Sequence, residues 1–147
     1  MKKFISLWTA TILSLPLLTA KEISIEYFEE IQLVSVYDGD TFMVNLYGLP
    51  EVFGNRIPVR VRGIDTPEIR GSQCEQERRN AREAKRFVEG YLSKAQRINL
   101  INVERGKYFR LIADVEVDGQ NLAQLLLDAG LAQRYLGVGL KPDWCNG

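Results

Sequence analysis

The sequence predicts an α+β fold that is mainly β: a small barrel, closed or partly open, with helices packed on its outside. About five segments rich in β-branched and aromatic residues alternate between apolar and polar side chains, as half-buried strands do. Asp38-Gly39 and Asp118-Gly119 supply tight-turn chemistry between or after such segments, so neighbouring strands can pair locally. Two segments with helical periodicity complete the pattern.

The first two strands are expected at residues 31–37 and 41–47, as an antiparallel hairpin. A third strand, at residues 56–64, alternates aliphatic side chains with arginines, so one of its faces should carry charge. Two more strands are expected at residues 97–103 and 108–117.

An amphipathic helix of about twenty residues is expected between the third and fourth strands. It should start near Ser72, because Ser72 and Glu75 have the spacing of a capping box. A short helix at residues 122–129 is expected after the fifth strand, capped by Asn121 and ended by Gly130.

The length of 147 residues suits one domain preceded by an export signal. Two lysines precede an apolar stretch at residues 4–18, which is shorter than the roughly 20 residues that cross a bilayer. We therefore expect a signal peptide at residues 1–20, cleaved after Ala20, and a single domain at residues 21–147. An uncleaved anchor or a buried N-terminal helix are the alternatives. The expected product is secreted or periplasmic, monomeric and without stable membrane association after cleavage.

Export changes how the two cysteines, Cys74 and Cys145, are interpreted. In an oxidising compartment an even pair is more often a disulfide than two free thiols. A bond would tie the C-terminal tail to the start of the long helix, which the chain-entropy model values at roughly 4 kcal/mol. Two thiols in separate places are the alternative.

The composition narrows the possible chemistry. The chain has no histidine, which excludes Ser-His-Asp and Cys-His catalysis, the usual zinc ligand sets and an imidazole base. The formal net charge of zero argues against a protein that coats nucleic acid. A local basic site remains possible, because residues 21–55 carry one basic and seven acidic side chains, whereas residues 56–110 carry fourteen basic and seven acidic ones.

Two short acidic segments follow predicted strands: residues 38–41 (Asp-Gly-Asp-Thr) and 65–68 (Asp-Thr-Pro-Glu). Each alone is also explained by an ordinary turn. Together they offer carboxylate and carbonyl oxygens, the ligands that a hard cation such as calcium prefers. The sequence thus indicates a hard-cation site.

Arg60 and Arg110 offer planar guanidinium groups that fit phosphate oxygens, and Glu68 offers a spare carboxylate. With a divalent cation, such a set could stabilise the charge that develops on a phosphodiester while the carboxylate orients or deprotonates a water. For Arg60 the alternative is a surface salt bridge on a strand, worth about 0–1 kcal/mol. We expect Arg60→Ala to fold normally and to lose most activity.

The sequence resembles the thermonuclease, or staphylococcal-nuclease-like, family. The motifs that carry the resemblance lie at residues 38–41, 60–68, 107–110 and 118–132. The resemblance implies a five-stranded OB-fold barrel flanked by about three helices. It also implies a calcium-dependent nuclease, a phosphodiesterase that takes DNA and RNA as substrates.

The resemblance also implies roles for particular residues. These roles are calcium ligation by Asp40, Asp65 and the backbone carbonyl of Thr66, catalysis by Arg60, Glu68 and Arg110, and substrate binding by Lys107, Tyr108 and Tyr135. Tyr135 falls near the family's base-stacking tyrosines without aligning cleanly. Phe109 and Gly106 depart from the family pattern, which bears on substrate fit.

A noncatalytic nucleic-acid- or protein-binding OB module in the cell envelope is the alternative function, because barrels of this type often bind without cutting. In noncatalytic relatives the acidic ligands or the arginines are expected to be replaced. Both are present here, which favours the enzyme.

Overall fold

The computed structural model describes residues 27–29 and 31–146. The expected signal peptide lies outside these residues. The elements, in chain order, are β1 (Tyr27–Phe28), β2 (Ile31–Val36), β3 (Thr41–Leu46), α1 (Glu51–Gly54), β4 (Ile57–Val61), β5 (Ile64–Asp65), α2 (Glu75–Leu92), β6 (Ile98–Arg105), β7 (Leu111–Val117), β8 (Gln120–Asn121), α3 (Leu122–Asp128) and β9 (Gln133–Arg134). The mainly β fold with flanking helices is confirmed, as are its five principal strands, β2, β3, β4, β6 and β7.

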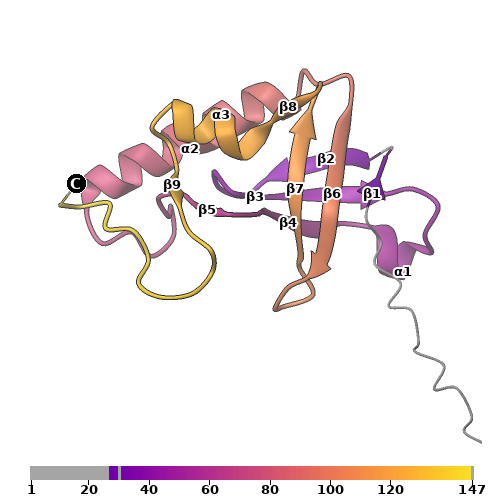
Figure 1. Cartoon of the computed structure of the whole chain (residues 1–147), viewed down its shortest axis with the longest axis horizontal. Coiled ribbons are helices and arrows are strands. Elements are labelled where there is room, and N and C mark those ends of the chain that lie inside the picture. Colours follow the sequence, from indigo (N-terminus) through magenta and orange to yellow (C-terminus); the bar gives the residue numbers. More distant parts are fainter. Residues whose placement is uncertain (1–26, 30, 147) are drawn as a thin grey trace, which may run out of the picture.

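The principal sheet has the strand order β1-β6-β7-β4-β3-β2, with β8 added beside β7. Its pairs are antiparallel except for β4 and β7, which run parallel. Figure 1 shows β6 and β7 crossing over β2, β3 and β4, so the sheet curls back on itself, while α2 and α3 lie along one side. Among the described strands the hydrogen-bonded path does not return from β2 to β1, which corresponds to the partly open form of the expected barrel.

Alternating apolar side chains build the core. Along β3 every second residue is buried, starting with Phe42, and along β7 the same alternation starts with Leu111. The apolar stripe of α2, including Ala84, Val88 and Leu92, packs against these strands in one hydrophobic cluster. The period-2 and period-3.6 patterns of the sequence therefore meet at a shared interior.

Two expected strands are shorter than predicted. The strand expected at residues 56–64 is divided into β4 and β5 by a turn at Arg62 and Gly63, where Gly63 has φ of +77°. The segment expected to begin a strand at Tyr108 is instead a tight turn, in which Tyr108 and Phe109 both have φ of 58°. A hydrogen bond from the amide of Gly106 to the carbonyl of Arg110 (2.7 Å) closes this turn.

The capping box expected at Ser72 is wrong. Helix α2 starts at Glu75, and its N-cap is Cys74, whose Sγ accepts a hydrogen bond from the amide of Glu77 (3.3 Å). The carboxylate of Glu77 turns back instead and accepts from the amide of Gln73 (2.6 Å). The start of α2 is thus set by contacts to the preceding loop, which the four-residue motif did not reveal.

Cys74 and Cys145 form a disulfide, with 6.0 Å between their Cα atoms. Figure 1 shows the C-terminal end of the chain beside the first turn of α2, where this bond holds it. The bond closes a loop across 71 positions, so the tail is fixed to the body of the protein by a covalent tether. In the described part of the chain no helix has the length and apolar character needed to cross a membrane.

The hairpin turn between β2 and β3 requires a glycine for reasons of space. The amides of Tyr37 (2.9 Å) and Asp38 (3.2 Å) donate to the carbonyl of Thr41 and close the turn. A Cβ added at Gly39 would lie 2.7 Å from the Cβ of Ala84 on α2 and 2.9 Å from Cγ2 of Thr66. Both distances are too short, so the absent side chain lets this turn dock against the helix and against the loop after β5.

We expect Gly39→Ala to lower the free energy of unfolding by about 1–3 kcal/mol, because it overpacks this contact. Urea unfolding of the purified variant measures the change. The matched control is Gly90→Ala on α2, where an added Cβ meets nothing within 4 Å. It should raise stability by about 0.5–1 kcal/mol, since alanine is the better helix former. Wild-type stability for Gly39→Ala would contradict the close approach.

Candidate active site

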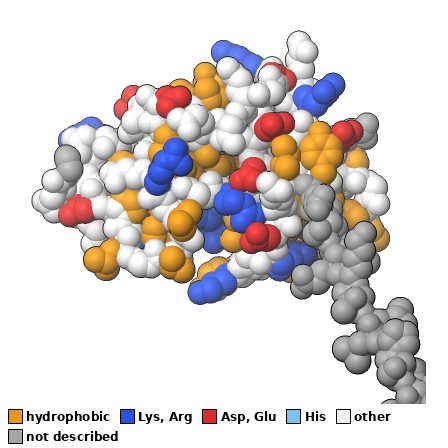
Figure 2. Space-filling model, viewed as in Figure 1, with side chains coloured by type: hydrophobic (Ala, Val, Ile, Leu, Met, Phe, Trp, Pro, Cys, Tyr) orange, Lys and Arg blue, Asp and Glu red, His pale blue; other side chains and the backbone are white. Residues whose placement is uncertain are grey.

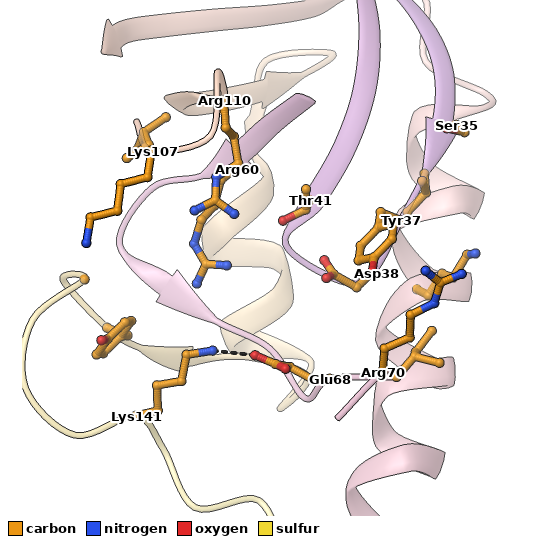
Figure 3. Close-up of a pocket in the computed structure, with 16 residues that line it drawn as sticks. Ser35, Tyr37, Asp38, Thr41, Arg60, Glu68, Arg70, Lys107, Arg110 and Lys141 are labelled. Atoms are coloured by element: carbon orange, nitrogen blue, oxygen red, sulfur yellow. Dashed lines mark hydrogen bonds and ion pairs between the residues drawn. The ribbon is translucent and has the colours of Figure 1, made fainter. Parts of the chain in front are cut away.

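A cavity of about 730 Å³ brings together residues from distant parts of the chain. Its walls include Arg60 of β4, Glu68 of the loop after β5, Lys107 and Arg110 of the turn before β7, and Tyr135 after β9. Figure 3 shows the side chains of Arg60 and Arg110 extending into the same space, with Lys107 beside them and Glu68 across from them. All three residues expected to be catalytic therefore line one cavity.

Arg60 bridges two buried carboxylates. Its Nη1 donates to Oδ1 of Asp40 (2.8 Å) and its Nη2 donates to Oδ1 of Asp65 (3.1 Å). The carbonyl of Ile64 accepts a further bond from Nη2 (3.3 Å). Asp40 and Asp65 are each only 2% exposed, whereas the cavity reaches Arg60. The guanidinium is thus held in one orientation between the carboxylates and the cavity.

Asp40 is fixed by the elements around it. The hydroxyl of Thr41 donates to its Oδ1 (2.8 Å) and the amide of Thr66 donates to its Oδ2 (3.2 Å). The carbonyl of Asp40 accepts from the amide of Val61 at the end of β4 (2.8 Å). The β2–β3 turn, β4 and the loop after β5 therefore meet at this carboxylate.

Burial opposes the negative charges gathered here. It raises the pKa of Asp38 to about 7, with a further contribution from the neighbouring charge of Asp40. Burial also raises the pKa of Asp40, although Arg60 and the hydroxyl of Thr41 act in the opposite direction. For Asp40, the guanidinium of Arg60 therefore offsets only part of the effect of burial.

The donors at this place suit a hard cation. Asp40, Asp65 and Thr66 are all buried and offer oxygen atoms alone. The hydroxyl of Thr66 is buried and has no hydrogen-bond partner among the described residues. Within the described ranges no three Asp, Glu, Cys or His side chains converge as a ready ligand cluster, so backbone carbonyls and water would have to complete the coordination. With that completion, the residues present fit a calcium ion.

Glu68 stands at the edge of the cavity with its side chain 47% exposed. Its amide donates to Oε1 of Glu77 on α2 (3.3 Å), which anchors the loop to the helix. Its own Oε1 accepts from Nζ of Lys141 (2.5 Å), a contact drawn in Figure 3. The carboxylate is thus accessible and already pairs with a cation of the chain itself.

Arg110 presents a guanidinium with little competition. Its Nε is buried without a hydrogen-bond partner among the described residues, and its side chain lines the cavity. A tight turn, found where a strand was expected to begin at Tyr108, places Arg110 immediately before β7. The donors of Arg110 are therefore available to an anion in the cavity.

The structure places the three expected substrate-binding residues differently. Lys107 and Tyr135 line the cavity, and the amide of Tyr135 donates to the carbonyl of Gly63 (3.0 Å). Tyr108 is not among the lining residues and is 90% exposed. The left-handed backbone of the turn is the physical reason, because it directs consecutive side chains differently from a strand.

Two residues of the C-terminal tail reach the site without having been identified from the sequence. Nζ of Lys141 lies 3.3 Å from Oδ1 of Asp65, and Nε1 of Trp144 donates to the other oxygen of Asp65 (3.4 Å). Hydrogen bonding to Glu68 and the charges of Asp65 and Glu68 raise the pKa of Lys141, although partial burial acts against this. The only sequence signal was Cys145 nearby, which indicates that the tail is anchored.

The face of the molecule in Figure 2 carries acidic, basic and apolar side chains interspersed, without a continuous field of one sign. The basic character is instead local: Arg60, Lys107, Arg110 and Lys141 all line the cavity. This agrees with the balanced charge of the whole chain. The arrangement is suited to binding a phosphate group at one place. It differs from a surface that coats a polyanion along its length.

The fold and the cavity define a mainly β protein in which arginines and lysines line an open cavity next to buried carboxylates. A family model described as staphylococcal nuclease homologue matches residues 58–141, more than half of the chain. The protein therefore belongs to the staphylococcal nuclease family, and its fold is the OB-fold of that family. Members are usually nucleases, which supports a hydrolase in general. A search among curated proteins gave no match.

The matched segment contains Arg60, Asp65, Glu68 and Arg110, whereas Asp40 precedes it. The hydrogen bonds of Asp40 to Arg60 and Thr66 nevertheless place it within the same site. The geometry thus extends the site beyond the segment that defines the family.

The alternative interpretation of Arg60, a surface salt bridge on a strand, is wrong, because its partners Asp40 and Asp65 are buried. We therefore expect Arg60→Ala to lose stability, in place of the normal folding that the sequence led us to expect. Removing Arg60 leaves two buried carboxylates without their shared partner, which should cost roughly 3–5 kcal/mol. The matched control is Arg62→Ala in the turn after β4, because Arg62 pairs with the more exposed Glu104 (3.0 Å) and Asp114 (3.4 Å). It should cost about 1 kcal/mol. Equal urea midpoints for the two variants would contradict the bridge.

Proposed function

We propose that this protein is a calcium-dependent phosphodiesterase that hydrolyses DNA and RNA. The observation that carries the proposal is the convergence of Arg60, Glu68 and Arg110 on one cavity, directly above the buried carboxylates of Asp40 and Asp65. Membership of the staphylococcal nuclease family supports the same reaction class.

Asp40, Asp65 and the carbonyl of Thr66 would hold the calcium ion. When bound, it would supply positive charge that stabilises the phosphate as negative charge develops on its oxygens. The burial of both carboxylates supports this assignment, because a divalent cation offsets the repulsion that one guanidinium leaves.

The arginines act by preorganised charge. Arg60 is oriented by three acceptors before any substrate arrives, so little reorganisation accompanies its contact with a phosphate. Arg110 approaches from the turn before β7 and offers the donors of a second guanidinium. Together they would bind the scissile phosphate and stabilise its pentacovalent transition state.

Glu68 would act on the attacking water, either by taking its proton or by holding it in position. Its exposed carboxylate at the cavity edge supports this role. Lys107 and Tyr135, which line the same cavity, would bind the phosphate and base of a neighbouring nucleotide.

We also propose that the protein is exported by a cleaved signal at residues 1–20 and acts as a secreted or periplasmic monomer. The disulfide between Cys74 and Cys145 supports an oxidising compartment. Mass spectrometry of the N-terminus of the natural product would test the cleavage after Ala20.

Incubation of the purified protein with single-stranded DNA, double-stranded DNA and RNA tests the proposed reaction. We expect cleavage in calcium and none after a chelator is added. Binding of nucleic acid without cleavage in calcium would favour the noncatalytic OB module. The contact of Glu68 with Lys141 is the observation in favour of that module, because it engages the proposed base.

Arg110→Ala should lower kcat/KM by about a hundred- to thousandfold, because one of the two guanidinium groups that would stabilise the transition state is lost. Its unfolding midpoint in urea should stay near that of the wild type, because Arg110 forms no ion pair among the described residues. The matched control is Arg97→Ala, an exposed arginine that does not line the cavity. The control should cleave at the wild-type rate. Full activity in Arg110→Ala would remove Arg110 from the proposed site.

A further inference from the structure

Lys141 supplies a cation to the carboxylates that the proposed function assigns to calcium and water. Its Nζ is 2.5 Å from Oε1 of Glu68 and 3.3 Å from Oδ1 of Asp65. Figure 3 shows its side chain reaching from the C-terminal segment across the cavity toward Glu68. One ammonium group therefore joins a proposed metal ligand to the proposed base.

The tail occupies Asp65 from both sides. Oδ1 of Asp65 is shared by Arg60 (3.1 Å) and Lys141 (3.3 Å), while Oδ2 accepts from the indole of Trp144 (3.4 Å). A calcium ion bound at Asp65 needs the same oxygen atoms. Two cations close to one carboxylate oxygen also repel each other, so Lys141 and calcium compete there.

The tail is built to hold Lys141 in this place. Pro142 restricts the backbone of the lysine before it to extended conformations. The carboxylate of Asp143 accepts from the amides of Cys145 (2.9 Å) and Asn146 (3.2 Å), which orders the last residues. The disulfide to Cys74 then fixes this segment to the first turn of α2.

The side chain of Lys141 is nevertheless 50% exposed, unlike that of Asp65, which is 3% exposed. The side chain of Lys141 can therefore move into solvent without disturbing the hydrophobic core. The contact is thus reversible, in contrast to the bridge made by Arg60, which is largely enclosed.

We propose that Lys141 is a built-in competitor for the cation site: its ammonium group pairs with Asp65 and Glu68 until a divalent cation displaces it, and the disulfide-anchored tail sets the affinity for that cation. This inference rests on the proposed function, because it assigns the cation to Asp65. It predicts that Lys141 keeps calcium from the site, and thereby prevents the proposed hydrolysis, when the calcium concentration is low. A higher calcium concentration displaces Lys141.

Isothermal titration calorimetry of the full chain with calcium chloride, in the absence of nucleic acid, tests the competition. Lys141→Met keeps most of the apolar stem and removes the ammonium group. We expect it to bind calcium about five- to tenfold more tightly, equivalent to about 1–1.4 kcal/mol at 1.4 kcal/mol per tenfold.

The matched control is Lys107→Met. Lys107 lines the same cavity but forms no ion pair with Asp65 or Glu68. It should change the dissociation constant by less than twofold. An equal shift in both variants would show a general charge effect and overturn the proposal, as would wild-type affinity for Lys141→Met.

The tether is tested by Cys74→Ser combined with Cys145→Ser, since serine can still accept the capping hydrogen bond at position 74. This variant, checked for folding by circular dichroism, should also bind calcium more tightly. Adding Lys141→Met to it should bring little further gain, because both changes free the same carboxylates. Fully additive effects would overturn the role of the tether.

Calorimetry separates this inference from the reaction itself. If Lys141→Met binds calcium more tightly and no variant cleaves nucleic acid, the competition stands and the proposed nuclease is wrong. If neither the wild type nor Lys141→Met binds calcium, freeing the carboxylates creates no site and the competition is wrong.

Discussion

The bridge from Arg60 to Asp40 and Asp65 is the interaction on which the rest of the site depends. It joins the turn after β2, the strand β4 and the short strand β5 in one charged cluster. Each partner alone would be expensive to bury, and together they are only partly compensated, since burial still raises the pKa of Asp40. The proposed calcium ion would be held by these same carboxylates, so the stability of the site and its proposed chemistry depend on one cluster.

Much of the fold could be predicted because its signals are local. Alternating burial along β3 and β7, the apolar stripe of α2 and the Asn121 cap of α3 all follow from residues a few positions apart. The candidate residues Arg60, Glu68 and Arg110 were predicted from their side-chain chemistry and from a resemblance whose family the model match supports, and they line one cavity. Spacing alone could not show that they share a cavity. Arg110 follows a turn at residues where the β propensity of the side chains predicted a strand.

The errors have two physical causes, which are local turn and cap geometry that residue patterns do not encode and contact between distant segments. Ser72 has the pattern of a cap, yet the disulfide partner Cys74 and the carboxylate of Glu77 determine where α2 begins. Lys141 and Trp144 reach Asp65 across more than seventy positions of chain, from a tail with no periodic pattern. In that tail the sequence indicated only an anchor, Cys145, and not what the anchor holds.

A crystal structure of the protein with calcium and a bound nucleotide would test the central claim most directly, namely that the carboxylates bridged by Arg60 form a cation site for phosphodiester hydrolysis. The account predicts anomalous density for calcium at Asp40, Asp65 and the carbonyl of Thr66, with the phosphate within reach of Arg60 and Arg110. Density for calcium elsewhere, or a phosphate bound away from both arginines, would contradict it.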